Sequence, residues 1–166
     1  MFNVVLVEPE IPPNTGNAGR LCLATDSTLH LVEPLGFSLD DRKLRRAGLD
    51  YWEKVKLRRW ANLSALEEAN PLARFFYLTT KSRRPYYEVD FAPGDFLVFG
   101  RETKGLPATL LDRKGNLCLT IPTLGVRSLN LATAVAVVLF EAMRQIQGAN
   151  APETGNRGFM DGDSKC

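Results

Sequence analysis

The 166-residue sequence is 45% hydrophobic and has 21 basic and 19 acidic residues, a formal net charge of +2. A chain of this length fits one domain that buries about 70% of its unfolded surface without disulfide or metal support. Cys22, Cys118 and Cys166 are widely spaced and His30 is the only histidine, which excludes a zinc cluster and favours a reducing, cytoplasmic setting. The first apolar run ends at Glu8 and is too short for a signal peptide or a membrane span.

Short apolar runs, partly β-branched, recur along the chain and predict buried strands. They comprise residues 3–7, 29–33, 75–79, 96–100 and 117–121, and "KVKLRRW" near residue 57 is a weaker candidate for an edge strand. Helices are expected from Thr15 to about Asp26, from Asp40 to Ala47, from Ser64 to Ala69 with Ser64 and Glu67 as a capping pair, and over a short stretch from Pro107. This alternation predicts an α/β domain in which helices flank a mostly parallel sheet, with ligands at the carboxyl ends of the strands.

The longest predicted helix runs from about Ser128 to Gln147, with Gly148 as its C-terminal cap. One apolar stripe on it comprises Leu131, Val135, Val138, Leu139, Ala142 and Ile146, and an adjoining stripe comprises Ala132, Ala136, Phe140 and Met143. The sheet needs only one stripe, so the second indicates deep burial or packing on another subunit, and we expect a homodimer. Residues 1–148 form the predicted domain, and the polar residues 149–166 are expected to be a flexible tail.

Basic residues are concentrated in two places. Between Arg42 and Arg59 there are eight of them against two acids. The second place is "KSRRPYY", residues 81–87. A charge run is often only a solvated helix face, but cations beside aromatic rings are typical of surfaces that contact RNA phosphates and stack on bases. Together the two patches favour an RNA partner.

Three glycine-bearing stretches follow predicted strands and are therefore expected near one edge of the sheet. They are "PEIPPNTGNAGR" (9–20), "FGRETKGLP" (99–107) and "IPTLGVRSLN" (121–130). In the second, Leu106 and Pro107 stand where a phosphate loop needs Lys and Ser or Thr, which disfavours a triphosphatase. No G-x-G-x-x-G follows a strand, and a lone histidine without a nucleophile elbow gives no support to hydrolase chemistry.

The order and spacing of "NTGNAGR", "FGRETKGLP" and "IPTLGVRSLNLATAVAVVLFEAMRQ" resemble the three motifs of SPOUT-class RNA 2′-O-ribose methyltransferases. The likeness is greatest to the small stand-alone branch that methylates the wobble nucleotide, cytidine or uridine 34, of leucine tRNAs. It extends through "EPEIPPNTGN", "EPLGF" and "DDRKLRRAGLDYWE" and so covers about residues 1–147. Phe140 is a departure, because relatives of this branch often have tyrosine there.

The resemblance implies a fold that periodicity does not reveal, an α/β domain with a deep C-terminal trefoil knot that works as a homodimer. It implies S-adenosylmethionine as the cofactor, without a metal, bound in the crevice of the knot. The implied cofactor contacts are Leu78, Thr79, Gly100, Glu102, Ile121, Ser128 and Leu129. Each also has a plainer interpretation: Leu78 and Ile121 as core residues, Ser128 as a helix cap, and Glu102 as a surface acid paired with Lys104.

The first motif is implied to face the RNA, with Asn14 and Arg20 as catalytic residues. Because a guanidinium has no proton-accepting form near neutral pH, Arg20 suits a phosphate clamp that stabilises a developing alkoxide better than it suits a base. Pro12 and Pro13 would then stiffen the loop, and Gly16 and Gly19 would admit the sugar-phosphate. The tRNA anticodon stem-loop is the expected partner, contacted by Arg20, Arg45 and Arg46.

Two alternatives to wobble methylation stay open at the level of sequence. The methyl group would go to another tRNA ribose or to ribosomal RNA, or the fold would be a non-catalytic RNA-binding module with a vestigial cofactor pocket.

Overall fold

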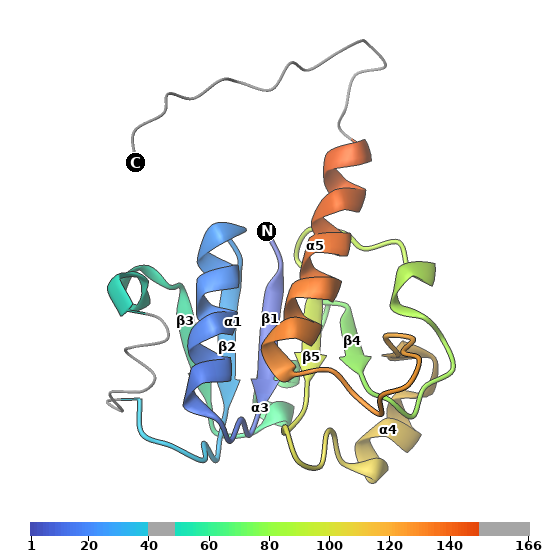
Figure 1. Cartoon of the computed structure of the whole chain (residues 1–166), viewed down its shortest axis with the longest axis horizontal. Coiled ribbons are helices and arrows are strands. Elements are labelled where there is room, and N and C mark those ends of the chain that lie inside the picture. The colour runs from blue at the N-terminus through green and yellow to red at the C-terminus, as the bar shows by residue number, and fades with distance from the viewer. Residues whose placement is uncertain (40–48, 150–166) are drawn as a thin grey trace.

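Six parallel strands form the sheet of the computed structural model, which describes residues 1–39 and 49–149, and their order is β3-β2-β1-β5-β4-β6 (Figure 1). The strands are β1 (Asn3–Val7), β2 (Thr28–Val32), β3 (Leu57–Trp60), β4 (Phe75–Leu78), β5 (Phe96–Phe99) and β6 (Cys118–Leu119). All five predicted strands and the weaker edge candidate are confirmed. The predicted α/β class with a parallel sheet is therefore correct.

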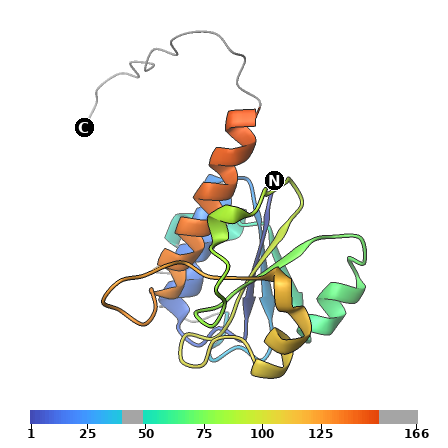
Figure 2. The same cartoon turned by 90° about the vertical axis from the view of Figure 1, so that its right-hand side faces the viewer.

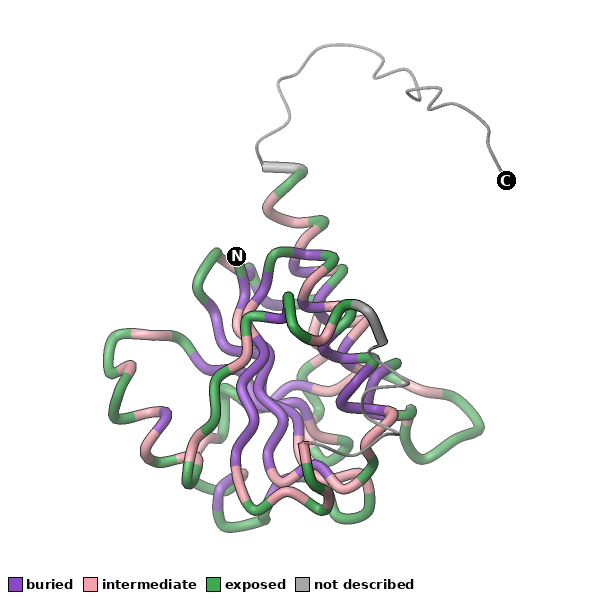
Figure 3. Tube along the Cα trace, turned by 90° about the vertical axis from the view of Figure 1, so that its left-hand side faces the viewer, coloured by how far each residue is buried: buried purple, intermediate pink, exposed green. Residues whose placement is uncertain are grey.

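Among the described α-helices, two cover each face of the sheet. The α-helices are α1 (Pro12–Ala24), α3 (Leu63–Glu68), α4 (Ala108–Lys114) and α5 (Leu131–Ala149), and the 3-10 helices are η1 (Leu49–Lys54), η2 (Tyr86–Glu88) and η3 (Gly115–Leu117). Val4 and Leu6 of β1 pack in the cluster that includes α1 and α5, whereas Val5 and Val7 pack in the cluster that includes α3 and α4. Figure 3 shows the strands as a buried centre between these layers. Burial on both faces explains why the strands are continuously apolar.

Helix α1 begins at Pro12, so the predicted start at Thr15 is wrong. Pro12 and Pro13 occupy the first two helical positions, where the missing N–H groups would have no partner in the helix and the fixed φ already suits helical backbone. The prolines therefore start the helix rather than stiffen a loop. Ala18, Gly19 and Cys22 are buried on its inner side.

The predicted capping pair of α3 is also wrong. Asn62 is the N-cap, and its side chain accepts a hydrogen bond from Ala65 N at 2.8 Å. Glu67 instead accepts from the Tyr77 hydroxyl and from Lys114 Nζ. The sequence placed the helix correctly but assigned its cap two residues too late.

Helix α5 starts at Leu131, not Ser128, because Asn130 caps it by accepting from the backbone N–H groups of Ala132 and Thr133. The helix continues through Gly148, which is therefore not its C-terminal cap. The first apolar stripe is the inner side: Val135 and Leu139 are fully buried in this chain's own core. In the second stripe Ala136 and Met143 are half-buried and Phe140 is 51% exposed. Figure 2 shows α5 rising beyond the sheet.

Some predictions fall outside the described residues. They are the helix from Asp40 to Ala47, the RNA contacts Arg45 and Arg46, and all of the predicted tail except Ala149. Among the helices that the structure describes, none is long and apolar enough to cross a membrane.

Candidate active site

A cavity of about 470 Å³ lies at the carboxyl edge of the sheet, enclosed by the segments that follow β1, β4, β5 and β6. Because β1, β5, β4 and β6 are consecutive neighbours, the topology brings these four segments together. All seven residues predicted to bind the cofactor line the cavity, namely Leu78, Thr79, Gly100, Glu102, Ile121, Ser128 and Leu129. Asn14 lines it as well. The prediction that the three motifs share one edge is confirmed.

The segments after β1 and β5 are locked together by reciprocal contacts. Glu8 forms an ion pair with Arg101. Glu10 accepts from Thr103 N at 3.1 Å and from its hydroxyl at 2.8 Å. Residues 8–10 therefore bind residues 101–103 at the edge of the sheet, and these contacts fix one wall of the cavity.

Glu102 binds the entrance of α1. Its carboxylate accepts from Glu10 N at 2.8 Å, Ile11 N at 3.2 Å and Asn14 Nδ2 at 3.1 Å. A negative charge at a helix N-terminus is stabilised by the free N–H groups and the helix dipole. No ion pair joins Glu102 to Lys104 in the described part of the chain, so the plain surface-pair interpretation of Glu102 is wrong.

Asn14 extends this network to the third motif. Its Oδ1 accepts from Asn130 Nδ2 at 2.9 Å, while its Nδ2 donates to Glu102. Asn130 in turn caps α5 through its own Oδ1. One carboxylate and two amides therefore connect all three motifs, and they leave a single Asn14 N–H for a ligand. The sequence motifs gave Asn130 no role of its own, so this link was not predicted.

Gly100 allows the segment after β5 to fold back on itself. A Cβ at Gly100 would lie 2.3 Å from the carbonyl carbon of Gly105 and from Leu106 N. Gly105 has a φ of +66°, a conformation that suits glycine. The tight loop exposes main-chain groups to the cavity where side chains would otherwise stand.

The segment after β4 is held along β6. Thr79 N donates to Leu119 O, Ser82 Oγ donates to Cys118 O, and Tyr86 N donates to Thr120 O. Lys81 and Arg83 project from this fixed backbone as exposed cations, and neither has an ion pair within the described ranges. Lys81 also lines the cavity.

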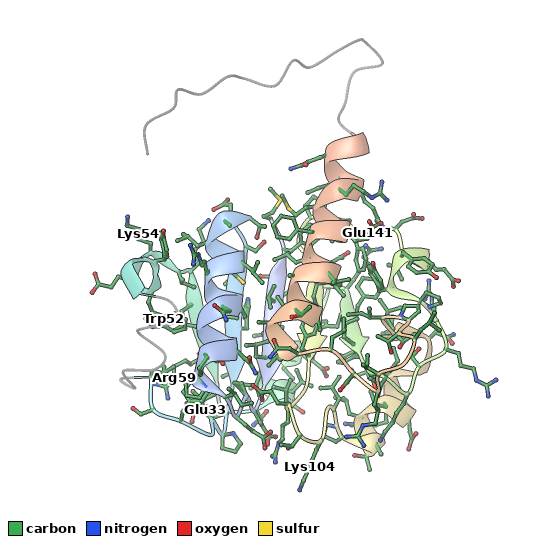
Figure 4. All side chains as sticks on the ribbon, viewed as in Figure 1. Glu33, Trp52, Lys54, Arg59, Lys104 and Glu141 are labelled. Atoms are coloured by element: carbon green, nitrogen blue, oxygen red, sulfur yellow. The ribbon has the colours of Figure 1, made fainter. Side chains whose placement is uncertain are left out.

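The cavity mouth carries a positive charge. Lys81, Lys104 and Arg127 line it and are exposed, and Figure 4 shows Lys104 directed outward from the lower edge. Neither described cysteine lines the cavity, and burial raises the pKa of Cys22 to about 12. A thiol nucleophile is therefore excluded for the described residues, and the charge favours an anionic substrate at the mouth.

Arg20 does not line the cavity. It lies on α1 six residues beyond Asn14, about 9 Å along the helix, and its guanidinium lies over the ring of Tyr51. Gly19 approaches Trp52 rather than a ligand, since a Cβ there would lie 2.7 Å from Trp52 Cζ3. Within one chain, then, the structure brings Asn14 to the cofactor residues but leaves Arg20 outside them.

Comparisons with known proteins agree with this arrangement. A model of the SpoU rRNA Methylase family matches residues 1–140. The chain belongs to this family. The SpoU fold implies the trefoil knot that the motifs predicted. The resemblance stated from the sequence is confirmed.

Close relatives are similar over most of the chain. It is 54% identical to a tRNA (cytidine(34)-2′-O)-methyltransferase of Burkholderia ambifaria over 150 residues, 87% of this chain and 96% of the relative. A protein of the same name from Polaromonas sp. is 49% identical over 164 residues, 95% of this chain and 100% of the relative. The second alignment therefore extends past residue 147, where the motif resemblance ended.

Two solved structures are similar to this one. A structure described as "Structural insights into the 2-OH methylation of C/U34 on tRNA" has a TM-score of 0.85 and 47% identity, and the similarity covers 89% of this chain and 97% of that one. The AdoMet-bound rRNA methyltransferase of Sinorhizobium meliloti has a TM-score of 0.78 and 25% identity, over 87% of this chain and 56% of that one. A SpoU methyltransferase of Streptomyces viridochromogenes has also been solved in complex with the cofactor AdoMet.

The residues of the cavity fit this cofactor. A volume of about 470 Å³ is in the range of small-molecule and cofactor sites. Leu78, Ile121 and Leu129 give the cavity apolar surface of the kind that encloses an aromatic ring, and the glycines at 100 and 105 leave main chain along its wall. The site thus combines apolar surface with polar and charged side chains, which suits a ligand that has both an aromatic ring and charged groups.

Proposed function

We propose that this protein transfers a methyl group from S-adenosylmethionine to the ribose 2′-hydroxyl of cytidine or uridine 34, the wobble nucleotide, in leucine tRNAs. The observation that carries the proposal is the cavity in which the segments of all three motifs meet, joined by Glu102, Asn14 and Asn130. Relatives at about half identity that are named for this reaction support it. Because its proposed substrate is tRNA, we place the enzyme in the cytoplasm.

In the proposed site, Leu78, Thr79, Gly100, Glu102, Ile121, Ser128 and Leu129 bind the cofactor, which supplies an electrophilic methyl group. Glu102 contributes mainly by fixing the wall of the cavity, because its carboxylate already accepts hydrogen bonds from the backbone at the start of α1. The apolar residues enclose the adenine. Asn14 lines the cavity, and we assign its remaining N–H to the ribose.

The transfer forms a bond between the 2′-oxygen and the methyl carbon, breaks the carbon–sulfur bond and releases the hydroxyl proton to solvent or to a phosphate oxygen. Most of the work is positioning, because oxygen, carbon and sulfur must be in line. We assign Arg20 to the phosphate beside the target ribose. Arg20 would contact this phosphate from outside the cavity. Its charge then stabilises the developing alkoxide without itself accepting a proton.

The proposed tRNA surface consists of the cations around the cavity mouth and the two basic patches. Lys81 and Arg83 are its best-placed described members, because the backbone that carries them is fixed along β6 and no carboxylate neutralises them there. Tyr87 is exposed nearby and suits base stacking. Arg45 and Arg46 belong to the proposed surface on their sequence alone.

A homodimer packed through α5 is part of the proposal. Phe140 is a large aromatic side chain exposed on a helix, and half-buried Ala136 and Met143 belong to the same stripe. An exposed apolar stripe beside a complete core is typical of a subunit contact. The inner stripe is already used by the chain's own core.

Methylation mapping tests the proposal. Leucine tRNAs from a deletion strain should lack ribose methylation at position 34, and the purified protein with S-adenosylmethionine should restore it. Loss at another tRNA position, or in ribosomal RNA, would replace the assigned site. Calorimetry with S-adenosylhomocysteine addresses the vestigial module, which predicts no binding and no methylation of any RNA.

A further inference from the structure

Arg20 and Tyr51 meet on the outer side of α1. The guanidinium carbon of Arg20 lies over the Tyr51 ring, 5.1 Å from its centroid. This is within the distance at which a ring attracts a cation through its negative face. The contact joins a residue of the first motif to η1, a segment that no predicted site residue occupies.

The neighbouring residues fix this contact in place. Trp52 follows Tyr51, and Gly19 precedes Arg20; a Cβ on that glycine would lie 2.7 Å from Trp52 Cζ3. Figure 4 shows Trp52 directed from η1 toward α1. Val55, also buried against Gly19, donates its N–H to Trp52 O. Although Tyr51 is 40% exposed, its backbone is therefore anchored on α1.

The contact holds the guanidinium but does not occupy its hydrogen-bond donors. Within residues 1–39 and 49–149, Arg20 makes no hydrogen bond or ion pair, its contact being the Tyr51 ring. Arg59 and Arg144 differ, because their donors bind the carboxylates of Glu33 and Glu141. A guanidinium over an aromatic face keeps its N–H groups available for an anion.

We propose that Tyr51 is a positioning residue for Arg20. Its ring restricts the guanidinium before the tRNA binds, so that less rotamer freedom is lost when Arg20 takes the phosphate beside the target ribose. This inference rests on the proposed function of Arg20. The ring face performs the role, and the tyrosine hydroxyl takes no part in it.

Single-turnover methylation of tRNA with saturating cofactor tests the inference. Tyr51→Leu should slow the reaction about two- to fivefold, and Tyr51→Phe should restore the wild-type rate, because a cation–π contact at an exposed site is worth about this factor. S-adenosylhomocysteine affinity and thermal unfolding should match wild type in both variants. Tyr51→Gln replaces Tyr51→Leu if the latter does not fold.

A double-mutant cycle separates positioning from a merely structural effect. In an Arg20→Ala background, Tyr51→Leu should cause no further loss of rate, because the residue that it positions is absent. An additive loss, or a wild-type rate for Tyr51→Leu, would overturn the inference. If wild-type protein fails to methylate tRNA at position 34, the proposed function itself is wrong, which is a distinct result.

Discussion

Asn130 Nδ2 donates to Asn14 Oδ1 at 2.9 Å, and this hydrogen bond joins residues 116 positions apart in the chain. The same Asn130 caps α5 through its Oδ1, and the same Asn14 donates to Glu102 at the start of α1. The two helices that cover one face of the sheet are thus tied together at the cavity. Their relative position decides the shape of the site.

Asn130→Ala should destabilise the fold and weaken the cofactor site together. It removes the cap of α5 and the link to Asn14, so the free energy of unfolding should fall by about 1–2 kcal/mol. S-adenosylhomocysteine affinity should fall as well, because the cavity wall loses its anchor. Urea unfolding and calorimetry measure the two effects.

Asn62→Ala is the matched control for this variant. It removes the cap of α3, on the other face of the sheet and away from the cavity. The stability loss should be about 1 kcal/mol, with cofactor affinity unchanged. Equal cofactor affinity in the two variants would show that the Asn14–Asn130 link does not shape the site.

Arg20→Ala should retain cofactor binding and lose about 100-fold or more in turnover, the scale of one lost preorganised donor. Arg20→Lys should keep part of the rate, since it keeps the charge but not the planar fork of donors. Single-turnover assays with saturating tRNA and cofactor measure both. A near-normal rate for the alanine variant would remove Arg20 from the chemistry.

The sequence predicts the strands well because their signal is local: β1, β4 and β5 are buried on both faces and read as continuous apolar runs. Helix starts are less well predicted. Both Ser64 and Ser128 are reasonable N-caps, but Asn62 and Asn130 make the hydrogen bonds. Which of several nearby polar residues caps a helix depends on where the chain enters it.

The candidate site is predicted through its motifs rather than through periodicity. Spacing brings the predicted cofactor residues to one cavity, but the hydrogen bond between Glu102 and Asn14 of α1 spans 88 positions and has no local signal. The glycine of "NAGR" illustrates the limit. The sequence assigned Gly19 to close approach by the sugar-phosphate, whereas the structure places Trp52 against it, a partner that is known only from the fold.

Phe140→Glu should yield a folded monomer. Because Phe140 is 51% exposed in its own chain, a charge there should disrupt the intersubunit contact and leave the core intact. Val135→Glu and Leu139→Glu are poor probes of the dimer, since both side chains are fully buried in their own chain and the variants should not fold. Light scattering measures the mass. Leu72→Glu, at a residue 98% exposed, is the matched control and should remain dimeric. A dimeric Phe140→Glu variant would exclude this stripe as the interface.

Arg83→Gln should weaken tRNA binding and reduce the salt dependence of binding by about one unit of slope, the effect of one lost phosphate contact. Arg144→Gln removes one charge outside the cavity mouth and outside both basic patches, on α5, where Arg144 is paired with Glu141. That variant should leave the slope unchanged. Binding titrations across salt concentrations measure both, and equal slopes for Arg83→Gln and wild type would remove the segment after β4 from the RNA surface.

His30 should make the fold sensitive to mild acid. It is buried between β1 and β3: Trp60 Nε1 donates to its Nδ1 at 3.0 Å, so Nε2 carries the proton and donates to Asn3 Oδ1. Burial, aided by the charge of Arg58, lowers the pKa of His30 from 6.5 to about 4. A protonated ring would lose the hydrogen bond from Trp60.

The sign of the effect follows from which state binds more protons. Between pH 6.5 and about 4 the unfolded chain is protonated at His30 and the folded chain is not, so the free energy of unfolding falls as the pH falls through this window. The total loss is on the order of 3 kcal/mol. Asp26 and Glu141, whose ion pairs lower the pKa of each carboxyl from ordinary values of 3.8 and 4.5, contribute at the acid end of this window and below it. Urea unfolding followed by tryptophan fluorescence from pH 7 to 4 measures the loss, and His30→Gln should be less stable at pH 7 but nearly flat across the window. Because His30 is the only histidine, an undiminished slope in that variant would assign the acid sensitivity to carboxylates instead.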